Sequence, residues 1–166
     1  IVMTIQICTI KERDCLDYKK IRLEMVNLYP QYFDVDRAKL NSLTDEEWML
    51  NVIDTIQNSN NRKFLAYDKD RCIGMISCEI TNNIMTIGSF YVVLDYRRKG
   101  IGKKLMDKCF ELSETRGCDV CKLWVSTVNK SALGWYKRLG FQSTEPPILK
   151  KFDHLELYYE ECLVKF

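Results

Sequence analysis

The most informative stretch of the chain is Phe90-Tyr-Val-Val-Leu-Asp-Tyr-Arg-Arg-Lys-Gly-Ile-Gly-Lys-Lys104. Its first part is rich in aromatic and β-branched residues, which is typical of a strand. Apolar residues that recur every three or four positions from Ile101 onward predict a helix that stops near Gly117. The stretch is therefore expected to be a strand that leads through a tight turn into a helix.

The turn itself has the composition of an anion site. Gly100 and Gly102 stand among five basic side chains within residues 97–104. Backbone N–H groups converge at a helix N-terminus, and glycine lets a phosphate approach them closely. The spacing lacks the third glycine of a dinucleotide fingerprint and does not match a P-loop. A solvated basic start of a helix is the alternative that composition alone leaves open.

The rest of the chain predicts a mixed α/β domain over residues 1–166. Strands are expected at 2–10, 63–68, 71–80, 84–94, 120–128, 141–149 and 154–164, and helices at 14–29, 44–57, after Gly100 and at 131–139. The last two strands are expected to pair around Pro146-Pro147. Short connections between the central strands imply antiparallel pairing. We therefore expect a mostly antiparallel sheet of about seven strands flanked by about four helices.

Two of these helices show an expected buried face. The first carries a stripe made of Tyr18, Ile21, Met25 and Leu28, and the second a stripe made of Met49, Val52, Ile53 and Ile56. Thr44 and Glu47 have the spacing of a capping box at the start of the second helix.

Composition excludes several classes of protein. The chain has 166 residues, 46% of them hydrophobic, and a net charge of +2. These values argue against a disordered chain and against a dedicated nucleic-acid binder. Eight cysteines lie mostly in apolar runs, and Cys118-x-x-Cys121 has no second ligand pair, so we expect reduced thiols and no metal. We expect His154 to be structural or exposed. Without a signal-peptide pattern or an apolar run of spanning length, we expect a cytoplasmic protein.

Two motifs resemble one family. Arg97-x-x-Gly100-x-Gly102 after a hydrophobic strand resembles the pyrophosphate-binding motif of the GCN5-related N-acetyltransferases. The segment from Asn129 to Phe141, Asn-Lys-Ser-Ala-Leu-Gly-Trp-Tyr-Lys-Arg-Leu-Gly-Phe, is similar to the family's second signature. The motifs cover residues 84–141, and the element order covers the whole chain.

The resemblance implies an acetyl-CoA-dependent enzyme without a metal. It would transfer acetyl to a primary amine of a small molecule or protein, directly and within a ternary complex. The residues it implies at the cofactor are Phe90, Tyr91 and Val92 along the pantetheine, and Arg97, Arg98, Lys99, Gly100, Ile101, Gly102 and Lys103 at the pyrophosphate. Asn129 would either contact the pantetheine arm or order the divergence of the strands. Tyr136 would lie at the thioester sulfur and protonate the departing thiolate. The alternative is that Tyr136 is an ordinary aromatic packing residue beside Trp135, with no role in proton transfer.

The general base is less well specified. Some family members carry a Glu on the strand after the long helix, where this chain has Trp124. Glu79 is our candidate for the base instead, because a carboxylate on a central strand is unusual unless it has a function. The alternative is that Glu79 is a solvated or edge-facing charge.

The acceptor and the rival functions rest on weaker patterns. Residues 40–61 carry four acidic side chains and no basic one, which would suit a cationic amine but also describes a solvated helix face. Tyr29, Tyr32 and Phe33 are candidates for the acceptor pocket. We expect no nucleic-acid or membrane partner, and the sequence leaves a homodimer open. The rivals are an inactive CoA-binding regulatory module and a weak nucleic-acid binder that uses residues 97–104.

Overall fold

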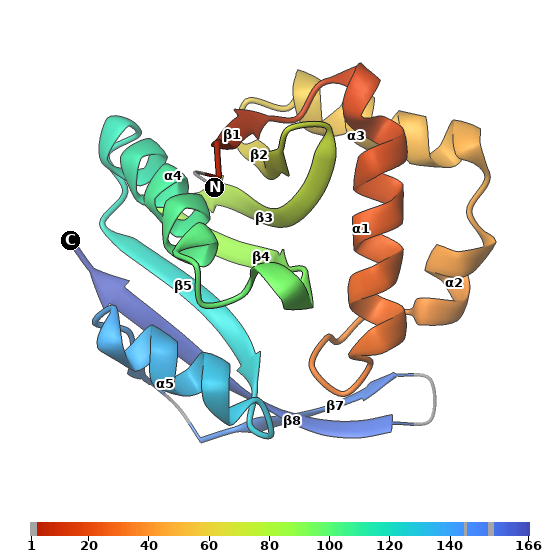
Figure 1. The fold of residues 1–166 in the computed structure, drawn as a ribbon. Helices are drawn as coiled ribbons and strands as arrows, with labels where there is room; N and C mark the ends of the chain where they lie inside the picture. The colour runs from red at the N-terminus through yellow and green to blue at the C-terminus, as the bar shows by residue number, and fades with distance from the viewer. Residues whose placement is uncertain (1–2, 145, 153–154) are drawn as a thin grey trace.

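A mostly antiparallel sheet forms the centre of the molecule (Figure 1). The computed structural model describes residues 3–144, 146–152 and 155–166, and within them the sheet has eight strands in the order β1-β2-β3-β4-β5-β8-β6, with β7 paired to β8. The strands are β1 (Ile5–Thr9), β2 (Asn61–Asp68), β3 (Arg71–Thr81), β4 (Ile84–Val92), β5 (Val120–Ser126), β6 (Gln142–Ser143), β7 (Ile148–Phe152) and β8 (Leu155–Lys165). The β4–β5 pair is parallel and the other pairs are antiparallel. The predicted fold class is confirmed, with one strand more than expected.

Helices cover both faces of the sheet. The α-helices are α1 (Cys15–Leu28), α2 (Arg37–Ser42), α3 (Asp45–Gln57), α4 (Ile101–Thr115) and α5 (Lys130–Arg138), and short 3₁₀ turns are η1 (Glu12–Asp14) and η2 (Leu94–Tyr96). One core lies between the sheet and α1 with α3, and a second lies between the sheet and α4 with α5 (Figure 1). The sequence did not predict α2, because that helix has six residues and buries none of them.

The buried faces of α1 and α3 differ in part from the predicted stripes. Tyr18, Ile21 and Met25 are buried as predicted, whereas Leu28 is 60% exposed at the end of α1. In α3 the buried residues are Trp48, Val52 and Thr55, and the predicted member Ile56 is 45% exposed. The Trp48 ring packs edge-on against Tyr18 at 5.7 Å. Because an indole buries far more apolar area than an isoleucine, Trp48 determines which face of α3 is buried.

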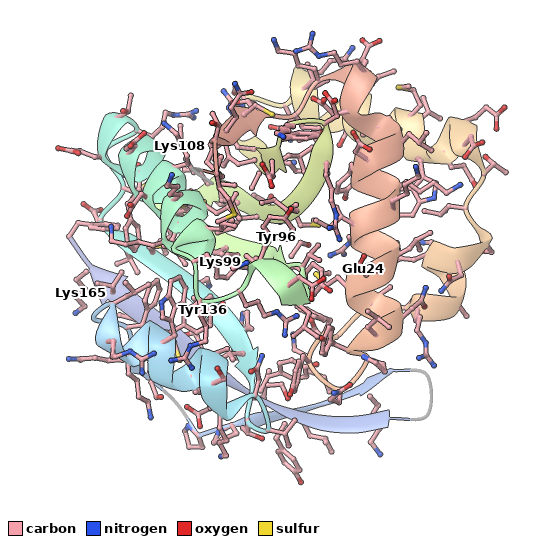
Figure 2. The ribbon with its side chains drawn as sticks, in the orientation of Figure 1. Glu24, Tyr96, Lys99, Lys108, Tyr136 and Lys165 are labelled. Atoms are coloured by element: carbon pink, nitrogen blue, oxygen red, sulfur yellow. The ribbon has the colours of Figure 1, made fainter. Side chains whose placement is uncertain are left out.

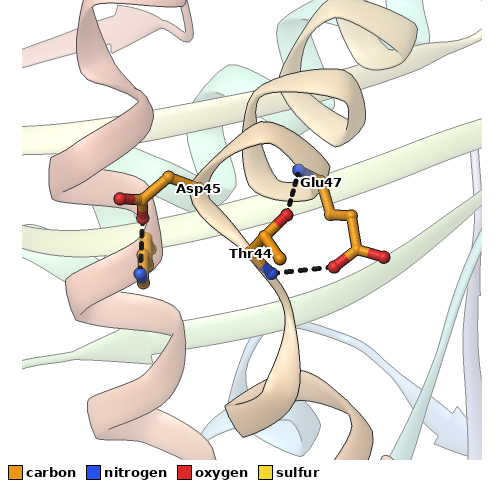
Figure 3. A network of polar contacts seen from close by, with 4 residues as sticks. Thr44, Asp45 and Glu47 are labelled. Carbon is orange, nitrogen blue, oxygen red and sulfur yellow. Dashed lines mark hydrogen bonds and ion pairs between the residues drawn. The ribbon is translucent and has the colours of Figure 1, made fainter.

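The predicted capping box fixes the start of α3 (Figure 3). The Thr44 hydroxyl accepts a hydrogen bond from the Glu47 N–H (3.2 Å), and the Thr44 N–H donates to the Glu47 carboxylate (2.8 Å). Lys19 of α1 donates to Asp45 at 2.7 Å. The acidic residues at this end of α3 thus cap the helix and join it to α1.

A β-bulge interrupts β4. Met75 of β3 pairs with Tyr91 and Ser77 pairs with Gly88, so that two residues of β4 stand opposite one of β3. The bulge holds Ser89 at a φ of 49°. As a result, Phe90 packs against the same core as Ile87, three positions earlier, instead of alternating to the other face.

The parallel strands β4 and β5 diverge at the bulge. Their pairing runs from Ile84 with Val120 to Ile87 with Leu123 and ends there. Beyond that point β4 continues toward η2 and β5 turns away toward β8 (Figure 1). Residues 88–92 of β4 therefore have no ladder partner on the β5 side.

The C-terminal strands differ from the prediction. The expected strand 141–149 is divided into β6 and β7, with Pro146-Pro147 between them, because proline has no N–H for a ladder. β7 pairs with β8 from Ile148 opposite Tyr159 to Phe152 opposite Leu155, and β6 also pairs with β8, so the expected antiparallel pairing of the last strands is confirmed. The predicted strand 84–94 ends at Val92, where η2 follows. His154 lies outside the described residues.

All eight cysteines carry free thiols, and six of them are buried. In the part of the chain that the structure describes, no helix combines the length and the apolar character needed to cross a bilayer.

Candidate active site

A cleft of about 1120 Å³ opens where β4 and β5 diverge. One wall comes from α1 and the loop that follows it, and the opposite wall comes from the η2–α4 turn and α5. The residues on the first wall are Arg22, Tyr29, Tyr32, Phe33, Asp34 and Val35, and those on the second include Arg97, Arg98, Gly100, Gly102, Lys103, Trp135, Tyr136 and Arg138. Residues 86–92 of β4, residues 123–125 of β5 and Tyr159 of β8 also line the cleft.

The η2–α4 turn presents an open helix N-terminus to the cleft. Gly100 has a φ of +79°, and no heavy atom lies within 4 Å of the point that a Cβ would occupy there. A Cβ at Gly102 would lie 3.2 Å from Cζ of Phe90. The Arg97 Nε–H donates to the Val92 carbonyl (2.8 Å) and holds the turn against β4. With no side chain at 100 or 102, the first N–H groups of α4 remain accessible, as binding of an anionic group requires.

Most of the predicted cofactor residues line this one cleft. They are Phe90, Tyr91, Val92, Arg97, Arg98, Gly100, Gly102, Lys103, Asn129 and Tyr136. Two others do not: the Ile101 side chain is buried in the α4 core, and the Lys99 ammonium lies 5.4 Å from the centre of the Tyr96 ring. Figure 2 shows Lys99 in the η2–α4 turn and Tyr136 on α5.

Tyr136 lies at the inner end of the α5 wall. Its side chain is 7% exposed and packs against the rings of Phe90, Trp135 and Phe141. The hydroxyl makes no hydrogen bond to any described residue, and burial raises the pKa of this phenol above its ordinary value. The hydroxyl therefore stays protonated at neutral pH and has its proton free to donate.

Asn129 supports the position of Tyr136 through helix α5. Its side-chain oxygen accepts a hydrogen bond from the Ala132 N–H at 3.2 Å and caps the helix. The structure thus uses this asparagine to begin α5 at the rim of the cleft.

The carboxylates are not where the sequence suggested. Glu79 is exposed on β3, between Asn61 of β2 and Thr86 of β4, and does not line the cleft. The acidic residues of α3 do not line it either. Asp34 is the one carboxylate among the described lining residues, and it forms an ion pair with Lys150 of β7. Glu79 and Tyr136 are therefore not brought together.

The wall formed by α1 holds polar residues that sequence reasoning missed. Arg22 donates a hydrogen bond to the Ser89 hydroxyl at the bulge. The Tyr91 hydroxyl donates to Glu24 at 2.7 Å; Figure 2 shows Glu24 on α1. Arg22 follows Tyr18 by four residues, which places it beside the buried stripe of the helix. This spacing could have predicted from the sequence that Arg22 faces the sheet.

A model of the acetyltransferase (GNAT) family matches residues 22–141, which include both walls of the cleft. The chain belongs to the GNAT family. Among curated GNAT relatives, the uncharacterized N-acetyltransferase MJ1207 of Methanocaldococcus jannaschii is 36% identical over 89 residues, which are 49% of this chain and 39% of that protein. N-alpha-acetyltransferase MAK3 of Arabidopsis thaliana is 34% identical over 82 residues, 47% of this chain and 43% of that protein. The chain thus spans about two fifths of these relatives.

Solved GNAT structures share the whole fold. The ribosomal L7/L12 alpha-N-protein acetyltransferase RimL, in complex with coenzyme A, has a TM-score of 0.83 at 14% identity, and the alignment covers 100% of this chain and 96% of that one. The PaiA N-acetyltransferase of Thermoplasma acidophilum, in complex with coenzyme A, has a TM-score of 0.76 at 19% identity, with 99% and 100% covered.

Two further features describe this GNAT cleft. The Lys150 ammonium lies 5.2 Å from the centre of the Trp124 ring and joins β7 to the loop after α1 through Asp34. Ser126 of β5 donates to the Gln31 carbonyl (3.0 Å), a second tie to that loop. Within the described residues, no three His, Cys, Asp or Glu side chains are grouped to hold a metal ion.

Proposed function

We propose that this GNAT protein is an acetyl-CoA-dependent N-acetyltransferase that transfers acetyl directly to a primary amine. The observation that supports the proposal is a cleft in which an open helix N-terminus, the unpaired side of β4 and the Tyr136 hydroxyl all meet. The same cleft continues to an aromatic wall on the α1 side, which leaves room for an acceptor beside the thioester.

Each part of the cleft matches one part of acetyl-CoA. The diphosphate would bind the first N–H groups of α4, with Arg98 and Lys103 nearby. The pantetheine amides would pair with the backbone of residues 90–92, whose β5 partner is absent. The α4 helix and β4 are rigid elements, so the cofactor's reactive end would be held in one orientation.

The transfer step needs a neutral amine and a proton donor for the thiolate. The amine nitrogen forms a bond to the thioester carbonyl carbon and gives up one proton to water in the cleft, the C–S bond breaks, and coenzyme A leaves as a thiol once its sulfur gains a proton. A phenol that donates this proton regains one from water, so the protons balance. A backbone N–H of β4 near Val92 would stabilise the oxygen of the tetrahedral intermediate. The protonated Tyr136 hydroxyl would donate a hydrogen bond to the sulfur. Because its pKa is raised, the phenol would act as a weak acid that shares its proton with the sulfur as negative charge develops there.

The acceptor we propose is the α-amine of a peptide. A peptide α-amine has a pKa of about 8 and is partly neutral at physiological pH, whereas an alkyl amine near about 10.4 needs a base to remove its proton. Asp34, the carboxylate that lines the described cleft, is already paired with Lys150. Two features therefore favour the α-amine: this electrostatic setting, and the similarity to proteins named N-alpha-acetyltransferases.

Two measurements test the proposed function. Acetyl-CoA at about 100 times its Kd should raise the free energy of unfolding by about 2.7 kcal/mol, seen as a thermal shift. Thiol release should then be faster with peptide α-amines than with spermidine at equal concentration. A thermal shift without thiol release from any amine would indicate an inactive CoA-binding module, and no shift at millimolar acetyl-CoA would exclude CoA binding.

A further inference from the structure

The α1 wall of the cleft carries a positive charge, Arg22, that forms no ion pair with a described carboxylate. The Arg22 guanidinium lines the cleft, is mostly buried, and donates to the Ser89 hydroxyl. Among the side chains that the structure describes, no carboxylate lies within ion-pair distance of Arg22. A buried guanidinium is normally paired, because an unpaired buried charge is costly.

The surroundings add to this positive charge. Near Arg22, Lys63 of β2 is itself half-buried and donates to the Thr55 hydroxyl. The two cations repel one another, and burial together with Arg22 lowers the pKa of Lys63. Asp34, the acid among the described lining residues, acts on Arg22 through its charge, but its ion pair is with Lys150 of β7.

The position of Arg22 is as informative as its charge. Ser89 stands at the bulge, two residues beyond the last β4–β5 pair, so the guanidinium lies where the strands begin to diverge. The diphosphate site proposed above lies at the η2–α4 turn on the other wall, where Arg98 and Lys103 are available. An anion bound by Arg22 would therefore belong to the acceptor.

We propose that Arg22 binds a carboxylate of the acceptor, so that the preferred substrate is an anionic amine. This inference rests on the proposed function. The carboxylate has two possible sources: an acidic side chain among the first residues of a peptide, or the α-carboxylate of a free amino acid. A guanidinium suits either, because its planar donors match the two carboxylate oxygens.

Matched acceptors in which an amide replaces one carboxylate test the proposal, with kcat/KM expressed per neutral amine because the replacement also lowers the pKa of the amine. The peptide pair is Asp-Ala-Ala-Ala amide with Asn-Ala-Ala-Ala amide, and the small-molecule pair is phenylalanine with phenylalaninamide. A hydrogen bond to a charged group predicts that kcat/KM of the wild-type protein is about 10- to 100-fold higher for the anionic member of at least one pair. The pair that shows the difference identifies the source, and a difference confined to the phenylalanine pair would replace the peptide acceptor proposed above by a free amino acid.

Variants then assign the preference to Arg22. In Arg22→Gln the ratio within the pair should fall to about one, and Arg22→Lys should keep part of it. Ser89→Ala removes the hydrogen-bond partner but leaves the guanidinium, so its ratio should stay near that of the wild type. The Kd for acetyl-CoA is measured for each variant as a control. An unchanged Kd shows that the wall formed by the η2–α4 turn and α5 is still folded.

Three outcomes would overturn the inference. The first is that the wild-type protein uses both members of each pair equally; this result does not depend on whether any variant folds. The second is that Arg22→Gln lowers kcat/KM for both members by the same factor, which is the result expected if Arg22 only supports the bulge. Thiol release from no acceptor at all would remove the proposed function and this inference with it, whereas turnover without charge preference would remove only the inference.

Discussion

At the level of single residues, the proposed transfer step depends on the position of one phenol, that of Tyr136. Tyr136 is buried among aromatic rings, and its hydroxyl has no hydrogen-bond partner in the described part of the chain. Tyr136 lines the cleft, and its hydroxyl is not among the fully enclosed polar atoms that lack a partner, so the hydroxyl is open to the cleft. An unpaired hydroxyl that is open to the cleft is available to a bound thioester, as the proposed role requires.

Replacing this hydroxyl should slow the transfer step more than it weakens binding. Tyr136→Phe keeps the ring contacts and removes the donor, so kcat should fall about 10- to 100-fold while KM changes little, because the donated bond strengthens as charge develops on sulfur. Because burial raises the pKa of Tyr136, the wild-type kcat should not fall between about pH 7 and 10 through loss of this proton.

Steady-state kinetics of thiol release would measure both effects. Tyr158→Phe is the matched control, since Tyr158 is 54% exposed on β8 and does not line the cleft. Equal kcat values for Tyr136→Phe and the wild-type protein would remove Tyr136 from the proton-donating role.

At the level of elements, the η2–α4 turn and helix α4 form the part of the site that local sequence specifies best. The turn needs a residue with positive φ at Gly100 and a residue without a side chain at Gly102, and both positions carry glycine. The strand before the turn and the stripe after it are short-range patterns, so the element forms in the predicted place. By contrast, the buried face of α3 depends on Trp48 meeting Tyr18 of α1, which no local pattern contains.

A bulky side chain in the turn should block cofactor binding. Gly100→Trp places an indole in the open space before the N-terminus of α4, and the Kd for acetyl-CoA should rise at least about tenfold, or about 1.4 kcal/mol. Gly117→Trp is the matched control, because Gly117 also has a positive φ (+63°) and free space but lies at the other end of α4.

Calorimetric titration gives the two Kd values, and thermal unfolding followed by circular dichroism gives the loss of stability. This loss should be similar in both variants, because each places a tryptophan at a positive φ. If Gly117→Trp weakened acetyl-CoA binding as much as Gly100→Trp, the diphosphate site would not be at the turn.

Across the molecule as a whole, buried cations on the α1 side determine part of the pH dependence of stability. Desolvation and the nearby Arg22 lower the pKa of Lys63 to about 8 from its ordinary value of 10.5. The unfolded chain then binds more protons than the folded chain between these two pH values. The free energy of unfolding therefore gains a contribution that rises with pH from about 8 to 10.5.

Removing this lysine should remove that rise. Relative to Lys63→Met, the wild-type free energy of unfolding should increase by on the order of 1–2 kcal/mol between about pH 7.5 and 9.5. Urea unfolding at each pH measures the difference, and Lys20→Met on the exposed side of α1 is the control. Wild-type and Lys63→Met curves that stay parallel over this range would contradict the prediction.

Features that depend on neighbours within one turn or one strand could be predicted from the amino-acid sequence. The strand–glycine–helix unit, the capping box at Thr44 and the family motifs were all visible without coordinates, and they led to the fold class and to one wall of the cleft. Such features are local because backbone hydrogen bonding and apolar periodicity repeat at fixed short spacings.

The other wall of the cleft depends on tertiary packing. Arg22 meets Ser89 across 67 positions and Lys150 meets Asp34 across 116, while Glu79, a candidate by its strand, lies outside the cleft. These outcomes follow from strand order, from the bulge that resets alternation in β4, and from the divergence of β4 and β5. Which charges share a cleft depends on how distant segments pack, so the acceptor side could be read only from the folded chain.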